Sequence, residues 1–172
     1  MLPSAVPREL EFKVGDKSVH PHHGVGEVTA IEHREIAGQR KAFYTLHLMT
    51  EGTKVMVATD AAAKLGLRRP VSRRESTKVL DILRDKTIAV TSQPWNRRYR
   101  EYMEMLNSGS PYEVAKVLRD LSVIRGEKEL SFGERGLLDK ARNLLVGELA
   151  IARRCKEERM QTEIEAILGL GA

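Results

Sequence analysis

The stretch Arg68-Arg69-Pro70-Val71-Ser72-Arg73-Arg74-Glu75 separates two kinds of hydrophobic pattern in this chain. Before it, apolar and polar residues alternate, which is the period of a half-buried β-strand. After it, apolar residues recur every three or four positions, which is the period of an amphipathic helix. The change predicts an α+β fold class, with a β module at about residues 10–68 and a helical module at about residues 72–168.

Alternation in the first module is clearest at residues 42–48, where Tyr44, Leu46 and Leu48 would share one face of a strand. Glu51-Gly52 supplies a hairpin turn into the next strand. Short strands joined by tight turns, with no helical period among them, predict a small five-stranded antiparallel half-barrel.

Three serine-led segments in the second module have the spacing of helix N-terminal caps. They are Ser72-Arg73-Arg74-Glu75, Ser110-Pro111-Tyr112-Glu113 and Ser131-Phe132-Gly133-Glu134. In each, the serine oxygen can accept a hydrogen bond from the backbone three residues on, and the glutamate can accept one from the serine N–H. With Gly169 as the stop of a last helix, the pattern predicts four or five helices.

Length and composition exclude several classes of protein. A chain of 172 residues suits one domain or two small ones and is too short for a large multidomain enzyme. Its apolar runs fall well short of the ~20 residues of a membrane span, and Met1 to Pro7 lacks the basic start of a signal peptide. Cys155 is the single cysteine, so no internal disulfide can form. We expect a cytoplasmic protein.

His20, His22 and His23 form a cluster that could bind a metal ion or could lie in an ordinary polar turn. Adjacent histidines on an extended segment point to opposite faces and no cysteine is near, which favours the turn. The sequence also lacks a Gly-x-Ser-x-Gly elbow, a Gly-rich phosphate loop and a His-Glu-x-x-His helix. We expect no catalytic residue, cofactor or metal; a zinc hydrolase would require about one bound zinc per chain.

Trp95 is the only tryptophan, and its flanking residues support two interpretations. Pro94 places it in the first turn of a predicted helix. Three arginines follow: Arg97, Arg98 and Arg100. Basic residues beside an aromatic ring are typical of a surface that holds phosphates and meets bases, and the net charge of +5 permits such a partner. The alternative is a ring in the core, with the arginines on a solvated face paired with Glu101 and Glu104.

Five motifs, taken in order along the chain, carry a resemblance to a known family. They are Lys13-Val14-Gly15-Asp16, His20-Pro21-His22-His23-Gly24-Val25-Gly26, Trp95-Asn96-Arg97-Arg98-Tyr99-Arg100, Val117-Leu118-Arg119-Asp120-Leu121 and Leu130-Ser131-Phe132-Gly133-Glu134-Arg135. Together they resemble the CarD/CdnL family of bacterial RNA polymerase-binding transcription regulators. The resemblance spans about residues 11–168.

Membership implies a Tudor-like N-terminal module that docks on the polymerase β subunit, and a nucleoid-associated, cytoplasmic protein. It also implies a helical module that contacts promoter DNA beside the melting bubble and stabilises the open complex. Trp95 falls on the family's minor-groove wedge, beside basic DNA-binding positions at Arg97, Arg98 and Arg100. If each arginine neutralises about one phosphate, log K should fall with log salt at a slope of roughly −2.7.

The resemblance also implies a docking surface on the first module. Arg34 matches a basic position there, and Val55, Met56 and Val57 are further candidate polymerase-binding residues. A strand between about Ala42 and Val57 is expected to pair by its edge with a sheet of the partner. The family usually has a basic residue where Met56 stands, a proline where Ala58 stands and a tyrosine where His20 stands. An additional regulatory protein is therefore a further candidate partner. The alternative function is a protein–protein adaptor whose β module binds a partner other than polymerase.

Overall fold

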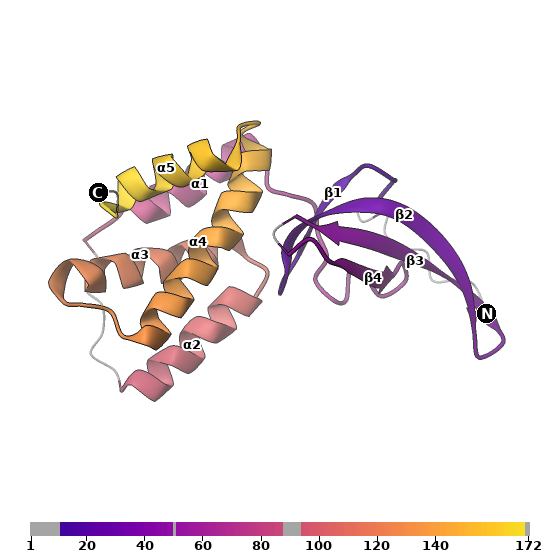
Figure 1. The fold of residues 1–172 in the computed structure, drawn as a ribbon, viewed down its shortest axis with the longest axis horizontal. Coiled ribbons are helices and arrows are strands. Elements are labelled where there is room, and N and C mark those ends of the chain that lie inside the picture. The colour runs from indigo at the N-terminus through magenta and orange to yellow at the C-terminus, as the bar shows by residue number, and fades with distance from the viewer. Residues whose placement is uncertain (1–10, 50, 88–93, 171–172) are drawn as a thin grey trace. The chain divides into compact units, whose positions relative to one another are not determined.

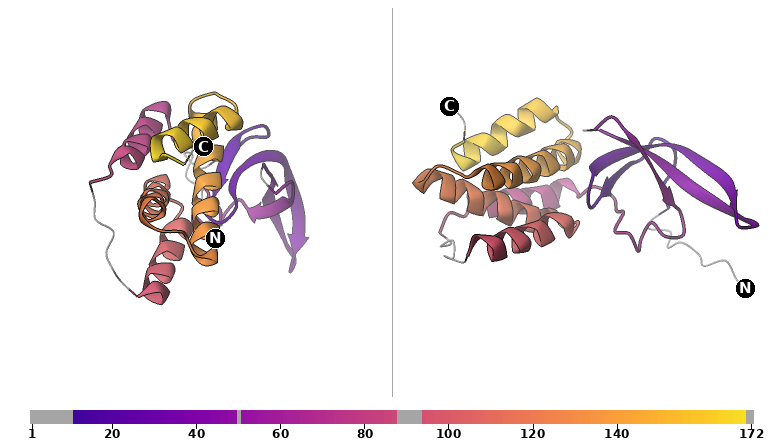
Figure 2. Two further views of the ribbon diagram at one scale, coloured as in Figure 1. Left: turned by 60° about the vertical axis from the view of Figure 1, so that its left-hand side comes forward. Right: turned by 60° about the horizontal axis from the view of Figure 1, so that its bottom comes forward.

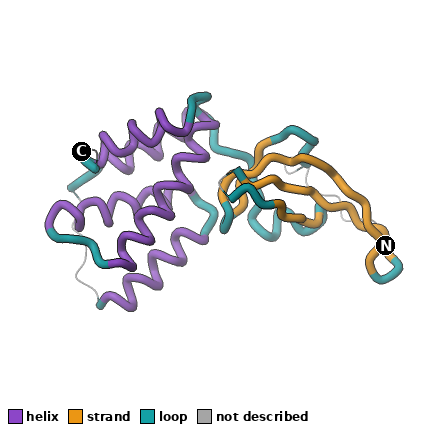
Figure 3. The backbone as a smooth tube through the Cα atoms, in the orientation of Figure 1, coloured by secondary structure: helices purple, strands orange, loops and turns teal. Residues whose placement is uncertain are grey.

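The computed structural model of the chain describes residues 11–49, 51–87 and 94–170. The chain divides into two compact units, residues 1–70 and 71–172 (Figure 1). In Figure 3 the described strands belong to the first unit and the described helices to the second. Met1 to Pro7, expected not to be a signal peptide, lies outside the described residues. No helix in the described part of the chain is long and apolar enough to cross a membrane.

The first unit is an antiparallel sheet with the strand order β1-β2-β3-β4. Its strands are β1 (Lys17–His20), β2 (Gly24–Ile36), β3 (Gln39–Leu48) and β4 (Lys54–Ala58). Figure 1 shows β2 and β3 curving together, which gives the sheet its curled form. This arrangement confirms the predicted half-barrel.

The expectation of five strands is wrong, because the described residues form four. Beyond these four strands, the described residues form one isolated bridge, between Val19 and Arg68. Gly66 has a left-handed φ of 88° two residues before the bridge, and Pro70 follows two residues after it. A proline cannot donate to a sheet, so the extended segment between these two residues is too short for a strand.

One face of the sheet carries its core. Tyr44, Leu46 and Leu48 share this face, as the alternation predicts, and all three are buried. The Tyr44 ring meets the Phe12 ring edge-on at a centroid distance of 5.6 Å. The cluster is completed by Val28, Val57, Ala62 and Leu67.

Two local features shape β2, β3 and β4. A bulge between Val28 and Ala30 shifts the register of β2 against β3 and bends the pair. Ala37 and Gly38 both have left-handed φ angles, 52° and 78°, which is the conformation of a type I′ hairpin turn. Gly52, with φ at 67°, forms the predicted turn before β4.

The second unit contains five helices among the described residues (Figure 2). They are α1 (Arg73–Arg84), α2 (Trp95–Asn107), α3 (Pro111–Glu127), α4 (Phe132–Ala152) and α5 (Glu157–Leu168). The three predicted caps are confirmed: the side chain of Ser72 accepts from the Glu75 N–H, Ser110 from Glu113, and Ser131 from Glu134. At α1 and α4 the glutamate also completes the capping box.

Helix α4 is the centre of the helical core, because it contacts each of the other four helices. Its buried face carries Leu137, Leu138, Ala141, Leu145 and Leu149. Glu148 interrupts this face and is itself buried, and its carboxylate accepts the backbone N–H of Val71 at 2.8 Å. The charge that splits the apolar run in the sequence therefore anchors the chain just before α1.

Candidate functional site

Trp95 is the first residue of α2, after Pro94 as the N-cap. The ring lies at the end of a helix, as predicted, and its centroid is 5.5 Å from that of Tyr99. It packs partly buried against the helical core. A Cβ atom added to Gly133, in the first turn of α4, would lie 3.0 Å from Cζ2 of the ring. Trp95 is therefore held against α4 without being fully buried.

The same ring lines a shallow hollow of about 450 Å³ on the surface of the helical unit. The other lining residues are Asn96, Tyr99, Arg100, Met103 and Gly133. The predicted apolar stripe of α2 is thus divided: Tyr102 and Leu106 are buried, whereas Tyr99 and Met103 line the hollow. The hollow offers an aromatic wall with one cationic residue at its side.

The three arginines that follow Trp95 have different surroundings. Arg97 is 72% exposed and its Nε lies 3.5 Å from Glu101, the i,i+4 pair expected on a solvated face. Arg100 is exposed and lines the hollow. Arg98 has only 15% of its side chain exposed and lies 3.0 Å from the Glu134 carboxylate. Arg97 and Arg100 are accessible to an anionic partner, whereas Arg98 is committed to an internal ion pair.

Glu134 makes several of the polar contacts of this region and is almost completely buried, with 2% of its side chain exposed. One carboxylate oxygen accepts the Ser131 N–H at 3.0 Å and lies 3.5 Å from the Lys128 ammonium. The other accepts from Arg98. The Arg98 guanidinium in turn lies 5.3 Å from the centre of the Trp95 ring. A chain of contacts therefore runs from Glu134 on α4 through Arg98 to the ring of Trp95 on α2.

Phe132 is an aromatic residue of this region that the sequence analysis did not assign. Its side chain is 87% exposed, and it directly precedes the glycine on which Trp95 rests. The signal was available in the sequence: the Ser131 cap fixes where α4 begins, and the stripe through Leu137 and Ala141 leaves position 132 off the buried face.

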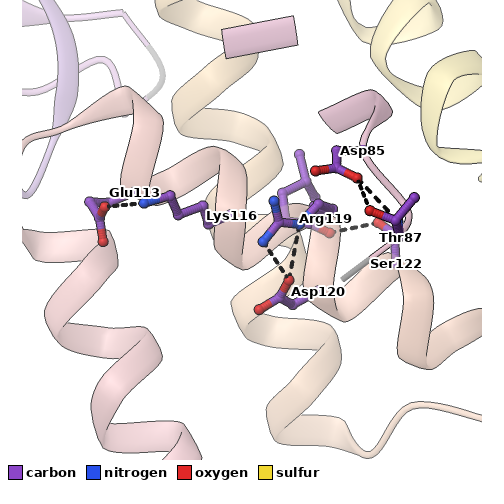
Figure 4. Close-up of polar contacts among 8 residues, drawn as sticks. Asp85, Thr87, Glu113, Lys116, Arg119, Asp120 and Ser122 are labelled. Atoms are coloured by element: carbon purple, nitrogen blue, oxygen red, sulfur yellow. Dashed lines mark hydrogen bonds and ion pairs between the residues drawn. The ribbon is translucent and has the colours of Figure 1, made fainter. Parts of the chain in front are cut away.

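A separate polar group lies around α3 (Figure 4). Arg119 donates from Nε to Asp120 at 3.1 Å, and Asp85, at the end of α1, accepts from the Thr87 hydroxyl at 2.7 Å. Burial raises the pKa of Asp120, against the opposing charge of Arg119. Burial, with a smaller contribution from Asp120, raises the pKa of Tyr102 to about 12. The hydrogen bonds of this group are local to α3 and to the end of α1, and they have a structural role.

The histidine cluster lies at the β1–β2 turn. The His20 ring nitrogen Nδ1 accepts the His22 backbone N–H at 3.1 Å, and His23 lies 3.4 Å from the Glu51 carboxylate. Burial, followed by the charges of His23 and His22, lowers the pKa of His20. Within residues 11–49, 51–87 and 94–170, no group of three or more His, Cys, Asp or Glu side chains could hold a metal ion. The observed contacts are those of a polar turn.

Arg34 and Met56 lie on one face of the sheet, opposite the core. Arg34 on β2 pairs in register with Lys41, and Met56 on β4 pairs with Thr45. Since Tyr44 on the same strand faces the core, the alternation of β3 directs Lys41 and Thr45 to the other face. Arg34 and Met56 are both exposed.

Val55 and Val57 differ from Met56. The Val57 side chain is 3% exposed within the core cluster, and Val55 packs against the same cluster. Their side chains therefore support the sheet, and of the three predicted docking residues on β4 only Met56 has an exposed side chain.

β4 is an edge strand, and its hydrogen-bonding pattern shows which peptide groups are available. The Leu48 N–H donates to Thr53 and the Thr59 N–H donates to Ala42, which fixes two hydrogen-bonded pairs between β3 and β4. Bonded and non-bonded pairs alternate along an antiparallel ladder. Given the register, the peptide groups of Lys54, Met56 and Ala58 point away from β3, toward the open edge. The Ala58 carbonyl accepts the Ala61 N–H at 3.1 Å, so only the N–H of Ala58 is available there.

Comparison with known families accounts for almost all of the described chain. Residues 12–71 match the CarD-like/TRCF RID domain, and residues 78–165 match the CarD C-terminal domain. The chain belongs to the CarD/CdnL family of transcription regulators. The Tudor-like β unit followed by a helical unit is the architecture expected for the family.

Two relatives illustrate the similarity. YdeB of Bacillus subtilis (strain 168), named as a candidate transcription factor, is 29% identical over 159 residues, which cover 88% of this chain and 98% of YdeB. The solved structure of CdnLNt from Myxococcus xanthus is 47% identical, covers 36% of this chain and 87% of that one, and superposes with a TM-score of 0.32.

In this CarD/CdnL member, the edge strand explains one departure from the family sequence. The peptide group of Ala58 points to the open edge. A proline at this position, which the family usually carries, would therefore remove no hydrogen bond of the sheet. The alanine here leaves one more N–H on the edge.

Proposed function

We propose that this protein is a non-enzymatic transcription regulator. Its β unit binds the β subunit of RNA polymerase, and its helical unit binds promoter DNA beside the melting bubble and stabilises the open complex. The observation that carries the DNA half is the Trp95 ring at the start of α2, beside a surface hollow and the exposed Arg97 and Arg100.

Docking on polymerase uses the open edge of β4. The outward N–H and C=O groups of Lys54 and Met56, together with the Ala58 N–H, offer donors and acceptors to an extended strand of the partner. Main-chain pairing of this kind provides affinity, and neighbouring side chains provide the choice of partner. Because the bonds come from the backbone, they are retained with methionine at a position where the family usually has a basic residue.

Arg34 adds a positive charge that can complement an acidic partner, on the face of the sheet that it shares with Met56. Its pairing with Glu32, at 3.2 Å, involves two exposed side chains and contributes little stability, so the guanidinium is free to exchange to a partner carboxylate. A rim charge of this kind acts chiefly on the association rate and on specificity.

Energetics determine how Trp95 acts on DNA. Unstacking a base step costs a few kcal/mol, while stacking an aromatic side chain on a base returns about 1–3 kcal/mol. Inserting the ring into intact duplex is therefore close to neutral or unfavourable. The wedge does not melt DNA by itself, but it stabilises a step that polymerase has already opened.

Tethering makes this weak contact effective. Attachment to polymerase raises the local concentration of the helical unit to about the millimolar range. A protein that binds the open complex better than the closed one shifts the population toward the open form by linkage. The expected result is a longer-lived open complex at unchanged sequence specificity.

A pull-down of the purified chain with the polymerase β subunit tests the docking half. Retention of the β subunit by the wild-type chain is expected. Failure to retain it, with the chain folded, would favour the adaptor function, in which the β unit binds a different protein.

A further inference from the structure

Arg98 occupies a position between a ring and a buried carboxylate. Its guanidinium carbon lies 5.3 Å from the centre of the Trp95 ring, and one terminal nitrogen lies 3.0 Å from Glu134. Its Nε is buried and has no hydrogen-bond partner among the described residues, as expected for a guanidinium held against a π face. The guanidinium therefore connects the start of α4 to the face of the Trp95 ring.

The carboxylate that holds Arg98 is itself rigidly held. Glu134 belongs to the capping box of α4, where it accepts the Ser131 N–H while its own N–H donates to the Ser131 hydroxyl. Because the Glu134 carboxylate and the Glu134 backbone N–H both bond to Ser131, the capping box restricts the rotamers of this glutamate. Arg98 is thus attached to a side chain that is itself held in place by Ser131.

The Arg98–Glu134 ion pair breaks less readily than the Arg97–Glu101 pair on α2. Arg97 and Glu101 are 72% and 48% exposed, and an exposed pair exchanges easily to another anion. Moving Arg98 to a phosphate would leave the buried Glu134 carboxylate without its closest cation, which is strongly unfavourable. Lys128, at 3.5 Å, is the remaining cation beside that carboxylate in the described structure.

We propose that Arg98 and Glu134 are positioning residues that hold the Trp95 ring in its DNA-binding orientation, and that Arg98 does not contact phosphate. The inference rests on the proposed function of Trp95 and refines it. Of the three arginines after Trp95, Arg97 and Arg100 contact the DNA backbone, whereas Arg98 acts through the ring.

The advantage of this arrangement is preorganisation. A tryptophan at the surface of a helix end samples several rotamers, and binding DNA would have to select one of them. Gly133 against the ring and Arg98 over its face restrict that choice before binding. Immobilising one such side chain in advance corresponds to about a two- to tenfold gain in affinity.

The sole tryptophan makes the orientation directly measurable, since all indole fluorescence of the chain comes from Trp95. We expect Arg98→Ala to shift the emission to longer wavelength and to increase quenching by acrylamide. The affinity for a forked promoter DNA should fall about two- to tenfold, with the slope of log K against log salt unchanged.

Arg97→Ala and Arg100→Ala are the matched controls. Each should reduce the magnitude of the salt slope by about 0.9, because each removes one phosphate contact, and should leave the emission unchanged. If Arg98→Ala reduces the slope by the same amount and leaves the emission unchanged, Arg98 is a phosphate contact and the positioning role is wrong.

Glu134→Gln provides a second variant that keeps the helix start intact, because glutamine also serves in a capping box. It removes the charge that holds Arg98 and should reproduce the emission shift of Arg98→Ala. An unchanged emission in this variant would contradict the proposal even if Arg98→Ala failed to fold.

The outcomes separate this inference from the proposed function. If Trp95→Ala binds forked DNA as well as wild type, the wedge function fails. The emission of Arg98→Ala and Glu134→Gln would still report whether Arg98 and Glu134 hold the ring.

Discussion

The Trp95 ring covers Gly133 so closely that a Cβ atom on the glycine would lie 3.0 Å from Cζ2. Because the ring is the end of a side chain, it moves more easily than the backbone of α4. Gly133→Ala should therefore displace the ring and shift the Trp95 emission to longer wavelength. The stability change should be small, because alanine in a helix offsets part of the clash by up to ~1 kcal/mol. Fluorescence measures the displacement of the ring, and a thermal melt measures the change in stability.

Gly136 is the matched control, one turn further along α4. A Cβ atom there would meet nothing within 4 Å. Gly136→Ala should stabilise the helical unit by about 0.5–1 kcal/mol and leave the emission of Trp95 unchanged. Equal emission shifts in both variants would show that the ring does not rest on Gly133.

Glu134 makes the stability of the helical unit depend on pH. Burial acts to raise its pKa, but the hydrogen bonds of Ser131 and then the charges of Lys128 and Arg98 hold the pKa below its ordinary value of 4.5. The unfolded chain binds this proton more readily than the folded one. The stabilisation is therefore complete above about pH 4.5 and is lost as the pH falls through the folded pKa.

Thermal melts of wild type and Glu134→Gln test this dependence, with Trp95 fluorescence as the reporter of the helical unit. Wild type should be the more stable protein near neutral pH, and the difference should shrink below about pH 4.5. A constant difference over the acidic range would show that the Glu134 charge contributes nothing.

Proline should have opposite effects at neighbouring positions of β4, because successive N–H groups point to opposite edges of the strand. The Met56 N–H points to the open edge, so Met56→Pro should leave the sheet folded and weaken retention of the polymerase β subunit. The Val57 N–H points toward β3, so Val57→Pro should lose a sheet bond and destabilise the β unit by about 3 kcal/mol or more. Full binding by folded Met56→Pro would exclude edge pairing at this position.

Arg34→Glu reverses the exposed charge on the outer face of β2. We expect slower association with the polymerase β subunit and weaker retention in a pull-down, because rim charges act on the association rate. DNA binding by the helical unit should not change. Retention equal to wild type would remove Arg34 from the docking surface.

Local signals in the sequence predicted the helical unit well. Each of the three serine caps needs only residues within one turn, and Ser72, Ser110 and Ser131 all cap helices as expected. The alternation through Tyr44 and Leu46 likewise identified the core face of the sheet. Caps and alternation depend only on residues close together in the sequence, so they can be predicted without knowledge of tertiary contacts.

Long-range relationships could not be predicted in this way. Glu134 was recognisable as a cap, but its pairing with Arg98 joins residues 36 positions apart on different helices. The three arginines after Trp95 look alike in the sequence, and only the packing of α2 on α4 distinguishes Arg98 from Arg97. The single bridge at Arg68 in place of a fifth strand also depends on tertiary contacts.

Trp95→Ala, as a folded protein, isolates the role of the ring. Because the ring is partly buried, the substitution should cost about 1–2 kcal/mol of stability, less than truncation of a fully buried residue such as Leu145. Retention of the polymerase β subunit should equal wild type, because the β unit is unchanged.

The lifetime of the promoter open complex, measured with polymerase and either wild type or Trp95→Ala, tests the central claim most directly. Wild type should prolong the lifetime, and Trp95→Ala should bind polymerase yet leave a shorter lifetime. An equal lifetime with both proteins would contradict the wedge and assign Trp95 to the packing of α2 on α4.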